Sequence, residues 1–360
     1  MSPHATLNPA VRRALAATAV LLLAACALLT ACDDGGDPVQ PQPTPGTIHG
    51  IGGWTEFDQF AVGEAGMILR YRGVDWKPFT SPTNKELYDV LGFGPSSAVV
   101  VGEGGIILEF NGSAFTPVAS PTTQTLRSLY GFSAANMIAV GDGGVILEND
   151  GSGWSMAASP AAARLRGVWA VSTGEAYAVG DSGEILHRTA GVWVRESAFT
   201  AATLRAVWAD KPRDWFAVGD GGEIWQNRGA GWFSMASPRT DDLYDVFGSD
   251  SAYVFAVGEA DSILFYDQIR WQPLFPLPVQ RFEAIWATIC ALPPPATDGP
   301  ATLHCSNTYF GGVEESVARF TLLGTYEIMS GPGPGSASAR SREPFPAHGA
   351  RNAPLLPGAR

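Results

Sequence analysis

The sequence predicts an all-β fold, a seven-bladed β-propeller of four-stranded antiparallel blades with a 39-residue repeat. A phrase of the form AVGDGGVIL recurs six times, and the glycine at its third position always follows the previous one by 39 residues. Each repeat holds four short runs rich in β-branched and aromatic residues. None shows the 3.6-residue period of an amphipathic helix. The six glycines are Gly63, Gly102, Gly141, Gly180, Gly219 and Gly258.

An export signal precedes the repeats. Arg12 and Arg13 stand before an apolar run, residues 14–29, which is short for a membrane span and placed like the hydrophobic region of a secretory signal. The run ends in LLTAC, a sequence that resembles a bacterial lipobox and places the lipid on Cys32. A second candidate, LLAAC, ends at Cys26. We expect Cys32 to be lipidated because the polar, proline-rich stretch that follows it has the composition of a flexible tether.

These features give a domain plan and a location. We expect a lipoprotein signal peptide at 1–31, a flexible tether at 32–46, the propeller at 47–330 and a disordered tail at 331–360. The lipid predicts a protein of the cell envelope, periplasmic or on the outer membrane or surface, and attached to the membrane only by its N-terminus. The formal charge of −12 argues against nucleic acid as a partner.

Within one repeat the strands follow in order, separated by turn residues. The fourth repeat gives LRGVWA at 165–170, EAYAVG at 175–180, GEILHRT at 183–189 and GVWVRES at 191–197. Four strands in about 40 residues is the size of one propeller blade.

A seventh repeat follows the six regular ones. RFEAIWA resembles the earlier first strands, and YFGGVEESVARF resembles the second and third. Gly312 comes 54 residues after Gly258, which is one period of 39 plus an insertion of 15. Cys290 and Cys305 stand at the two edges of this insertion, so we expect a disulfide that restrains it. Seven blades would close a ring with no open sheet edge.

Most recurring residues are interpreted as structural. One carboxylate per repeat stands in the turn between the second and third strands, where a short acidic side chain can accept backbone N–H bonds. Because these carboxylates are separated by the repeat symmetry, they do not form one catalytic constellation, and we expect no catalytic residue, metal or cofactor. Recurring aromatic residues are expected to fill the space between blades. The turn carboxylates are Glu64, Glu103, Asp142, Asp181, Asp220 and Glu259.

The phrase AVGDGGVILENDGSGW is similar to the repeat of the bacterial-neuraminidase-repeat propellers. It most resembles the photosystem II stability and assembly factor-like propellers and their lipoprotein relatives. The resemblance covers about residues 47–330. The Asp-box itself is absent, since Asn149 and Asn227 stand where its aspartate would be. The resemblance therefore implies the propeller and a partner-docking surface rather than sialidase activity.

One column differs between repeats and keeps residue types that are not structural. It follows the first apolar residue of each first strand, and we expect its side chains near one mouth of the central channel. Its arginines either pair with turn carboxylates or bind a carboxylate or phosphate of a partner. The resemblance implies the second role. The column runs His49, Tyr88, Arg127, Arg166, Arg205, Tyr244 and Glu283.

We therefore predict a monomeric, non-catalytic scaffold that binds a protein partner with an acidic or carboxylate-bearing segment. Two alternatives stay open. A neuraminidase-like glycoside hydrolase would use Tyr88 or Tyr244 with Glu283, together with arginines that converge on one carboxylate. A carbohydrate-binding lectin would repeat near-identical sites between blades.

Overall fold

A computed structural model describes residues 46–55, 57–250, 253–259 and 262–273, and beyond them the strands at 282–287, 308–312, 316–320, 326–330 and 340–341. All of these belong to one compact unit, Pro43–Arg360. The predicted lipidation sites Cys26 and Cys32 and the predicted disulfide between Cys290 and Cys305 lie outside the described residues. The signal peptide, nearly all of the tether and most of the predicted tail do too. No helix in the described part of the chain is long and apolar enough to cross a membrane.

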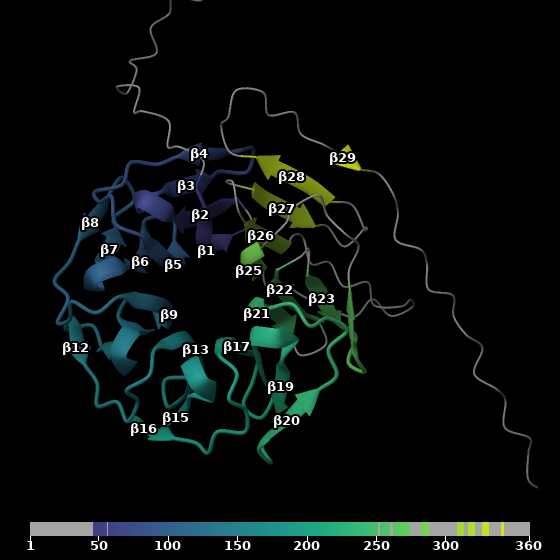
Figure 1. Cartoon of the computed structure of the whole chain (residues 1–360). Coiled ribbons are helices and arrows are strands. Elements are labelled where there is room, and N and C mark those ends of the chain that lie inside the picture. Colours follow the sequence, from purple (N-terminus) through teal and green to yellow (C-terminus); the bar gives the residue numbers. More distant parts are fainter. Residues whose placement is uncertain are drawn as a thin grey trace, which may run out of the picture. The chain divides into compact units, whose positions relative to one another are not determined.

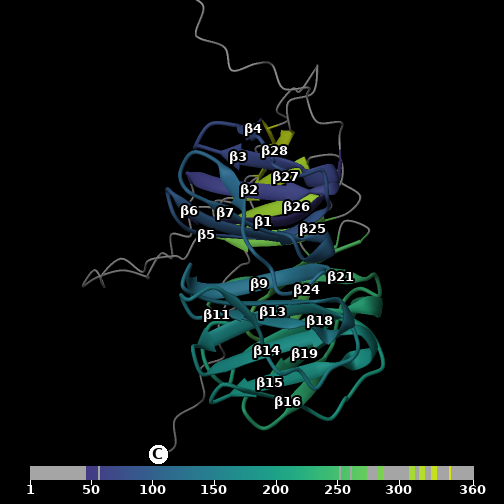
Figure 2. The same cartoon turned by 90° about the vertical axis from the view of Figure 1, so that its left-hand side faces the viewer.

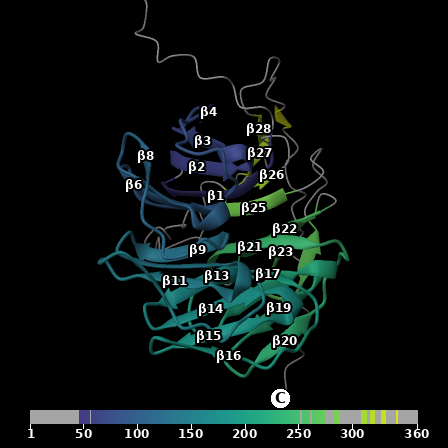
Figure 3. The ribbon, with the colours of Figure 1, turned by 60° about the vertical axis from the view of Figure 1, so that its left-hand side comes forward.

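The described chain folds into antiparallel sheets that follow one another around a central axis (Figure 1). The first strand of each sheet lies innermost. In the views of Figure 2 and Figure 3 the strands run across the thickness of this array, so that each first strand passes from one mouth of the channel to the other. The first strands are β1 (Ile48–Thr55), β5 (Leu87–Gly94), β9 (Leu126–Ser133), β13 (Leu165–Ser172), β17 (Leu204–Ala209), β21 (Leu243–Asp250) and β25 (Phe282–Ala287).

The remaining strands lie progressively farther from the axis. The second strands are β2 (Asp58–Gly63), β6 (Ser97–Gly102), β10 (Asn136–Gly141), β14 (Glu175–Gly180), β18 (Trp215–Gly219), β22 (Tyr253–Gly258) and β26 (Thr308–Gly312). The third strands are β3 (Ile68–Tyr71), β7 (Ile107–Phe110), β11 (Ile146–Asn149), β15 (Ile185–Thr189), β19 (Ile224–Asn227), β23 (Ile263–Tyr266) and β27 (Ser316–Phe320). The fourth strands are β4 (Trp76–Pro78), β8 (Phe115–Pro117), β12 (Trp154–Met156), β16 (Val192–Arg195), β20 (Trp232–Met235), β24 (Trp271–Pro273) and β28 (Tyr326–Ser330).

The prediction of seven four-stranded blades needs a correction. Six sheets, β1–β4 through β21–β24, have four strands and are propeller blades. The last sheet has five strands, because β29 (Arg340–Ser341) pairs antiparallel with β28 and extends its edge. β25 of this sheet contacts both β21 and β1. The departure lies in a segment that we expected to be tail, where no repeat could indicate a strand.

A tight turn joins the second and third strands of five blades. In the third blade Gly143 and Gly144 have φ of 68° and 73°, in the left-handed region that glycine adopts readily. A Cβ on Gly144 would lie 2.3 Å from the carbonyl oxygen of Ala161, so glycine is also required by space. These turns are short 3-10 helices: η1 (Glu64–Gly66), η2 (Glu103–Gly105), η3 (Asp142–Gly144), η4 (Asp181–Gly183) and η5 (Asp220–Gly222).

The core lies between neighbouring blades. Phe60 and Val62 of the first blade pack with Val100 and Phe110 of the second. Trp193 lies on β16, the outermost strand of the fourth blade, and its side chain is buried against the third blade. Apolar burial on both faces of each sheet therefore stabilises the blades against one another. It also fixes the positions of the innermost strands.

Candidate functional site in the central channel

The column singled out in the sequence lies on a β-bulge in every sheet. In β9, Leu126 pairs with Gly141 and Ser128 pairs with Val140, which leaves Arg127 with no partner of its own in the ladder. We call the seven residues at this place the bulge column. They are His49, Tyr88, Arg127, Arg166, Arg205, Tyr244 and Glu283, each inside the register shift of its first strand.

A backbone bond brings the turn aspartate to the bulge. The Asp142 N–H donates to the carbonyl oxygen of Thr125, two residues before Arg127, at 2.9 Å. The same bond joins Asp181 to Arg164 and Asp220 to Thr203, both at 2.9 Å. The turn carboxylate of each blade is thereby held beside the bulge of the same blade.

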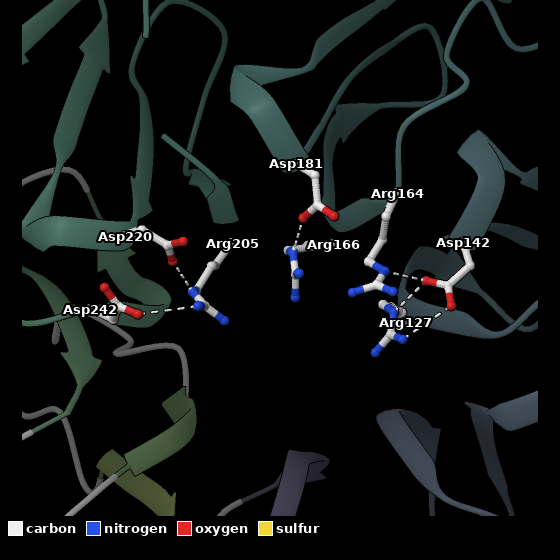
Figure 4. A network of polar contacts seen from close by, with 8 residues as sticks. All are labelled: Arg127, Asp142, Arg164, Arg166, Asp181, Arg205, Asp220 and Asp242. Atoms are coloured by element: carbon white, nitrogen blue, oxygen red, sulfur yellow. Dashed lines mark hydrogen bonds and ion pairs between the residues drawn. The ribbon is translucent and has the colours of Figure 1, made fainter. Parts of the chain in front are cut away.

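Arg127 is bonded to Asp142 by two parallel hydrogen bonds from one edge of its guanidinium. Its Nε lies 2.6 Å from Asp142 Oδ1, and an NH2 donates to Oδ2 at 3.1 Å. The Nε of Arg164, from the next blade, lies 2.7 Å from the same Oδ1. Asp142 thus joins two neighbouring blades (Figure 4).

Arg166 and Arg205 are bonded differently. Each donates from Nε to the turn aspartate of its own blade, Asp181 and Asp220 respectively. Arg205 also donates from an NH2 to Asp242 of the following blade, at 3.2 Å. Among the described residues, Arg166 forms its hydrogen bond through Nε alone. Figure 4 shows its terminal nitrogens pointing away from Asp181.

Two tyrosines flank the arginines. The Arg127 guanidinium lies over the ring of Tyr88, 4.8 Å from the centroid, and Arg205 lies over Tyr244 at 4.7 Å. Such cation–π contacts hold the guanidinium planes and add to the ion pairs. The result is an ordered series of side chains on five consecutive blades, with Arg166 at its centre.

The ends of this series are also bonded. The Tyr244 hydroxyl donates to Glu259 Oε1 at 2.6 Å. His49 stacks on Tyr88 with centroids 5.3 Å apart, and its Nε2 lies 3.0 Å from Glu86 Oε2. The side chain of Glu283 lies outside the described residues.

The charges of the cluster balance. Four arginines face four aspartates in Figure 4, so their formal charges sum to zero. Burial acts to raise the pKa of Asp142, but the bonds and charges of Arg127 and Arg164 outweigh it and hold that pKa below its usual range. Burial acts to lower the pKa of Arg127, but the bonds and charges of Asp142 and Tyr88 together outweigh burial and raise that pKa. Both groups remain charged at neutral pH.

Sequence reasoning missed a second column, two residues before the bulge. Its members bond across the junction to the preceding blade: Glu86 to His49, Arg164 to Asp142 and Asp242 to Arg205. The 39-residue spacing of these positions was visible in the sequence. The pattern within one repeat, however, does not indicate which of its residues contact residues of the neighbouring repeat. The turn aspartates were expected to accept backbone bonds, and pairing with the arginines of the column was the alternative left open; three of them do pair with these arginines.

The six described members of the bulge column line one open cavity of about 880 Å³ on the channel axis. Its lining continues along the first strands to aromatic side chains, among them Tyr130, Trp169 and Phe247. Asp89 is also part of the wall, and desolvation raises its pKa to about 6. Among the described residues, no three histidine, cysteine or acidic side chains gather as a metal site would require.

Comparison with known proteins supports the fold. No family model and no curated protein matches the chain. Among solved structures, "YCF48 bound to D1 peptide" has 17% identity and a TM-score of 0.60 over 78% of this chain and 94% of that chain.

Two further structures are similar. "YCF48 from Cyanidioschyzon merolae" has 15% identity and a TM-score of 0.61 over 78% of this chain and 97% of that chain. The WD40 β-propeller domain of Doa1 has 11% identity and a TM-score of 0.61 over 78% and 94%. The fold is a β-propeller.

Proposed function

We propose that the chain is a non-catalytic scaffold that binds a protein partner through a carboxylate at the end of the cavity that holds the bulge column. The observation that carries this proposal is the bonding of Arg166. Its Nε is held by Asp181, while its terminal nitrogens point away from that aspartate (Figure 4). An arginine fixed in this way can donate two parallel bonds to an incoming carboxylate without first losing side-chain freedom.

Arg127 and Arg205 extend this site on either side. Each already uses a terminal nitrogen in bonding an aspartate, so each has fewer donors left than Arg166. Because the formal charge of the cluster is balanced, we attribute binding to directed hydrogen bonds rather than to an excess of positive charge. One of the similar structures, YCF48, is bound to D1 peptide, which agrees with a peptide ligand for this fold.

The geometry does not favour the glycoside hydrolase. The three arginines bond three different aspartates instead of converging on one point. A tyrosine nucleophile would need a lowered pKa, but burial raises the pKa of Tyr88.

The binding test compares two arginines of one blade. Arg166→Gln removes the proposed anchor, and Arg195→Gln removes a half-exposed arginine on β16 that bonds Glu184. We expect Arg166→Gln to weaken binding of a labelled peptide library with free carboxyl ends by at least about tenfold, since a charge-assisted bond contributes about 1.5–3 kcal/mol. Arg195→Gln should bind as wild type. Equal binding by the three proteins, measured by fluorescence anisotropy, would contradict the proposal.

We further propose that lipid on Cys32 anchors the protein in the cell envelope, and that the five-stranded sheet closes the ring as its seventh blade. Feeding an alkyne fatty acid to cells that express the chain tests the first point. Label should disappear in Cys32→Ser and remain in Cys26→Ser, and the reverse pattern would place the lipid on Cys26. A single-particle density map with six blades would refute the second point.

A further inference from the structure

Three strands carry both an arginine and an aromatic residue in the cavity, three positions apart. Three residues of strand span about 10 Å, so the arginine and the aromatic residue of one strand lie at different depths along the cavity. The coincidence falls on the three consecutive blades that hold the arginines. The pairs are Arg127 with Tyr130 on β9, Arg166 with Trp169 on β13, and Arg205 with Trp208 on β17.

The aromatic residues form one group across the channel, which we call the aromatic cluster: Tyr130, Trp169, Trp208 and Phe247. Ring centroids of Tyr130 and Trp169 lie 4.1 Å apart, and those of Trp169 and Trp208 lie 6.3 Å apart. Trp169 also meets Phe247 edge to face at 5.7 Å, although their blades are not neighbours. The rings therefore gather toward the axis rather than between two adjacent sheets.

The exposed surface of this cluster faces the cavity. Trp208 is buried, but Tyr130, Trp169 and Phe247 are only half-buried, although they lie on innermost strands and line the cavity. The indole N–H of Trp169 donates to the carbonyl oxygen of Ala209 at 2.7 Å. Its one polar atom is thereby used, and the ring offers a ligand an apolar surface.

We propose, on the basis of the function proposed above, that the ligand is the free carboxyl terminus of a partner chain whose last residue is large and apolar. The terminal carboxylate accepts bonds from the Arg166 end of the cavity, and the last side chain packs on the aromatic cluster. An internal acidic side chain does not meet both demands, because its carboxylate and its apolar neighbours point in separate directions. The hydrogen-bond donors of Arg166 lie at one end of the cavity and the apolar rings lie farther along it, so this arrangement fixes the direction in which the terminus enters.

Four labelled peptides test this ligand class by fluorescence anisotropy. They are GGSGSF with a free carboxyl end, GGSGSA with a free carboxyl end, GGSGSF amide, and GGSESG amide, which carries only an internal carboxylate. We expect the first to bind wild type at least tenfold more tightly than each of the others.

The outcomes separate this inference from the function it rests on. If the phenylalanine and alanine peptides bind equally, and both bind better than the amide, the function stands and the inference is overturned. The inference also fails if the internal glutamate peptide binds as well as the free terminus. If the amide binds as well as the free acid, carboxylate recognition itself is wrong.

Variants locate the apolar contact. Trp169→Leu should reduce the preference for phenylalanine over alanine by at least fivefold while leaving the preference for acid over amide. Phe247→Leu makes the same test from another strand, should the first variant fold poorly. Phe233→Ala, an exposed aromatic on the outer strand β20, is the matched control and should change neither preference. An unchanged phenylalanine preference in folded Trp169→Leu and Phe247→Leu overturns the proposal.

Discussion

Asp89 makes the stability of the propeller depend on pH in an unusual direction. It lies in the channel wall, where its carboxylate accepts backbone bonds from Leu129 at 2.9 Å and Val90 at 2.8 Å. Protein atoms surround it, although part of its surface reaches the cavity. Desolvation raises its pKa from an ordinary 3.8 to about 6, against the opposing effect of these bonds.

The sign follows from proton binding. Between pH 4 and pH 6 the folded protein keeps a proton on Asp89 that the unfolded chain has lost. Stability from this group is therefore fully present below pH 3.8 and is lost as the pH rises through about 6. The difference between the two pKa values corresponds to at most about 3 kcal/mol of unfolding free energy.

Asp89→Asn removes the titration, so urea denaturation of both proteins from pH 3.5 to pH 7.5 measures the effect. The variant has its own constant deficit of about 1–3 kcal/mol, because an amide accepts only one of the two backbone bonds. The stability of wild type relative to the variant should fall by up to about 3 kcal/mol as the pH rises. Asp75→Asn, at an exposed site, controls for loss of a surface charge. A difference that stays constant or grows with pH would refute the reasoning.

Two further predictions concern stability and are measured by urea denaturation at pH 7. Arg70 is 6% exposed, bonds both oxygens of Asp58 at 2.9 and 2.8 Å and lies 4.9 Å from the ring centroid of Phe110. Arg70→Met should lower the free energy of unfolding by about 3 kcal/mol, and adding Asp58→Leu should recover most of it; no recovery would show that the loss is one of packing. Gly144→Ala should cost more than about 3 kcal/mol, since its Cβ would meet a carbonyl oxygen at 2.3 Å. Gly153→Ala, with φ of 119° and nothing within 4 Å, should cost about 1 kcal/mol, and equal losses would contradict the steric argument.

The fold could be predicted from the repeat period, because the strands, turns and bulges recur with the same spacing. The first strands begin 39 residues apart, from Ile48 to Phe282, at the places where the sequence patterns put them. Arg127, Arg166 and Arg205 were found by the same alignment of columns. The fifth strand at Arg340 could not be found in this way, because it belongs to no repeat.

What the sequence could not supply is how side chains meet across blades. Glu86 bonds His49 and Asp242 bonds Arg205 over 37 residues, a separation set by the packing of two sheets. The bonding of Arg166 through Nε alone is likewise a matter of angle and distance. The raised pKa of Asp89 depends on the number of protein atoms around it, which no residue type indicates.

The bulge has a consequence for how this ring can change. A residue that pairs with no partner strand can be replaced without altering the hydrogen bonds of its ladder, so this one position in each blade tolerates histidine, tyrosine or arginine on the same backbone. The channel therefore has one substitutable position per blade around one rim. Substitutions there can change the side chains that a ligand meets, one blade at a time, while the backbone of the propeller stays the same.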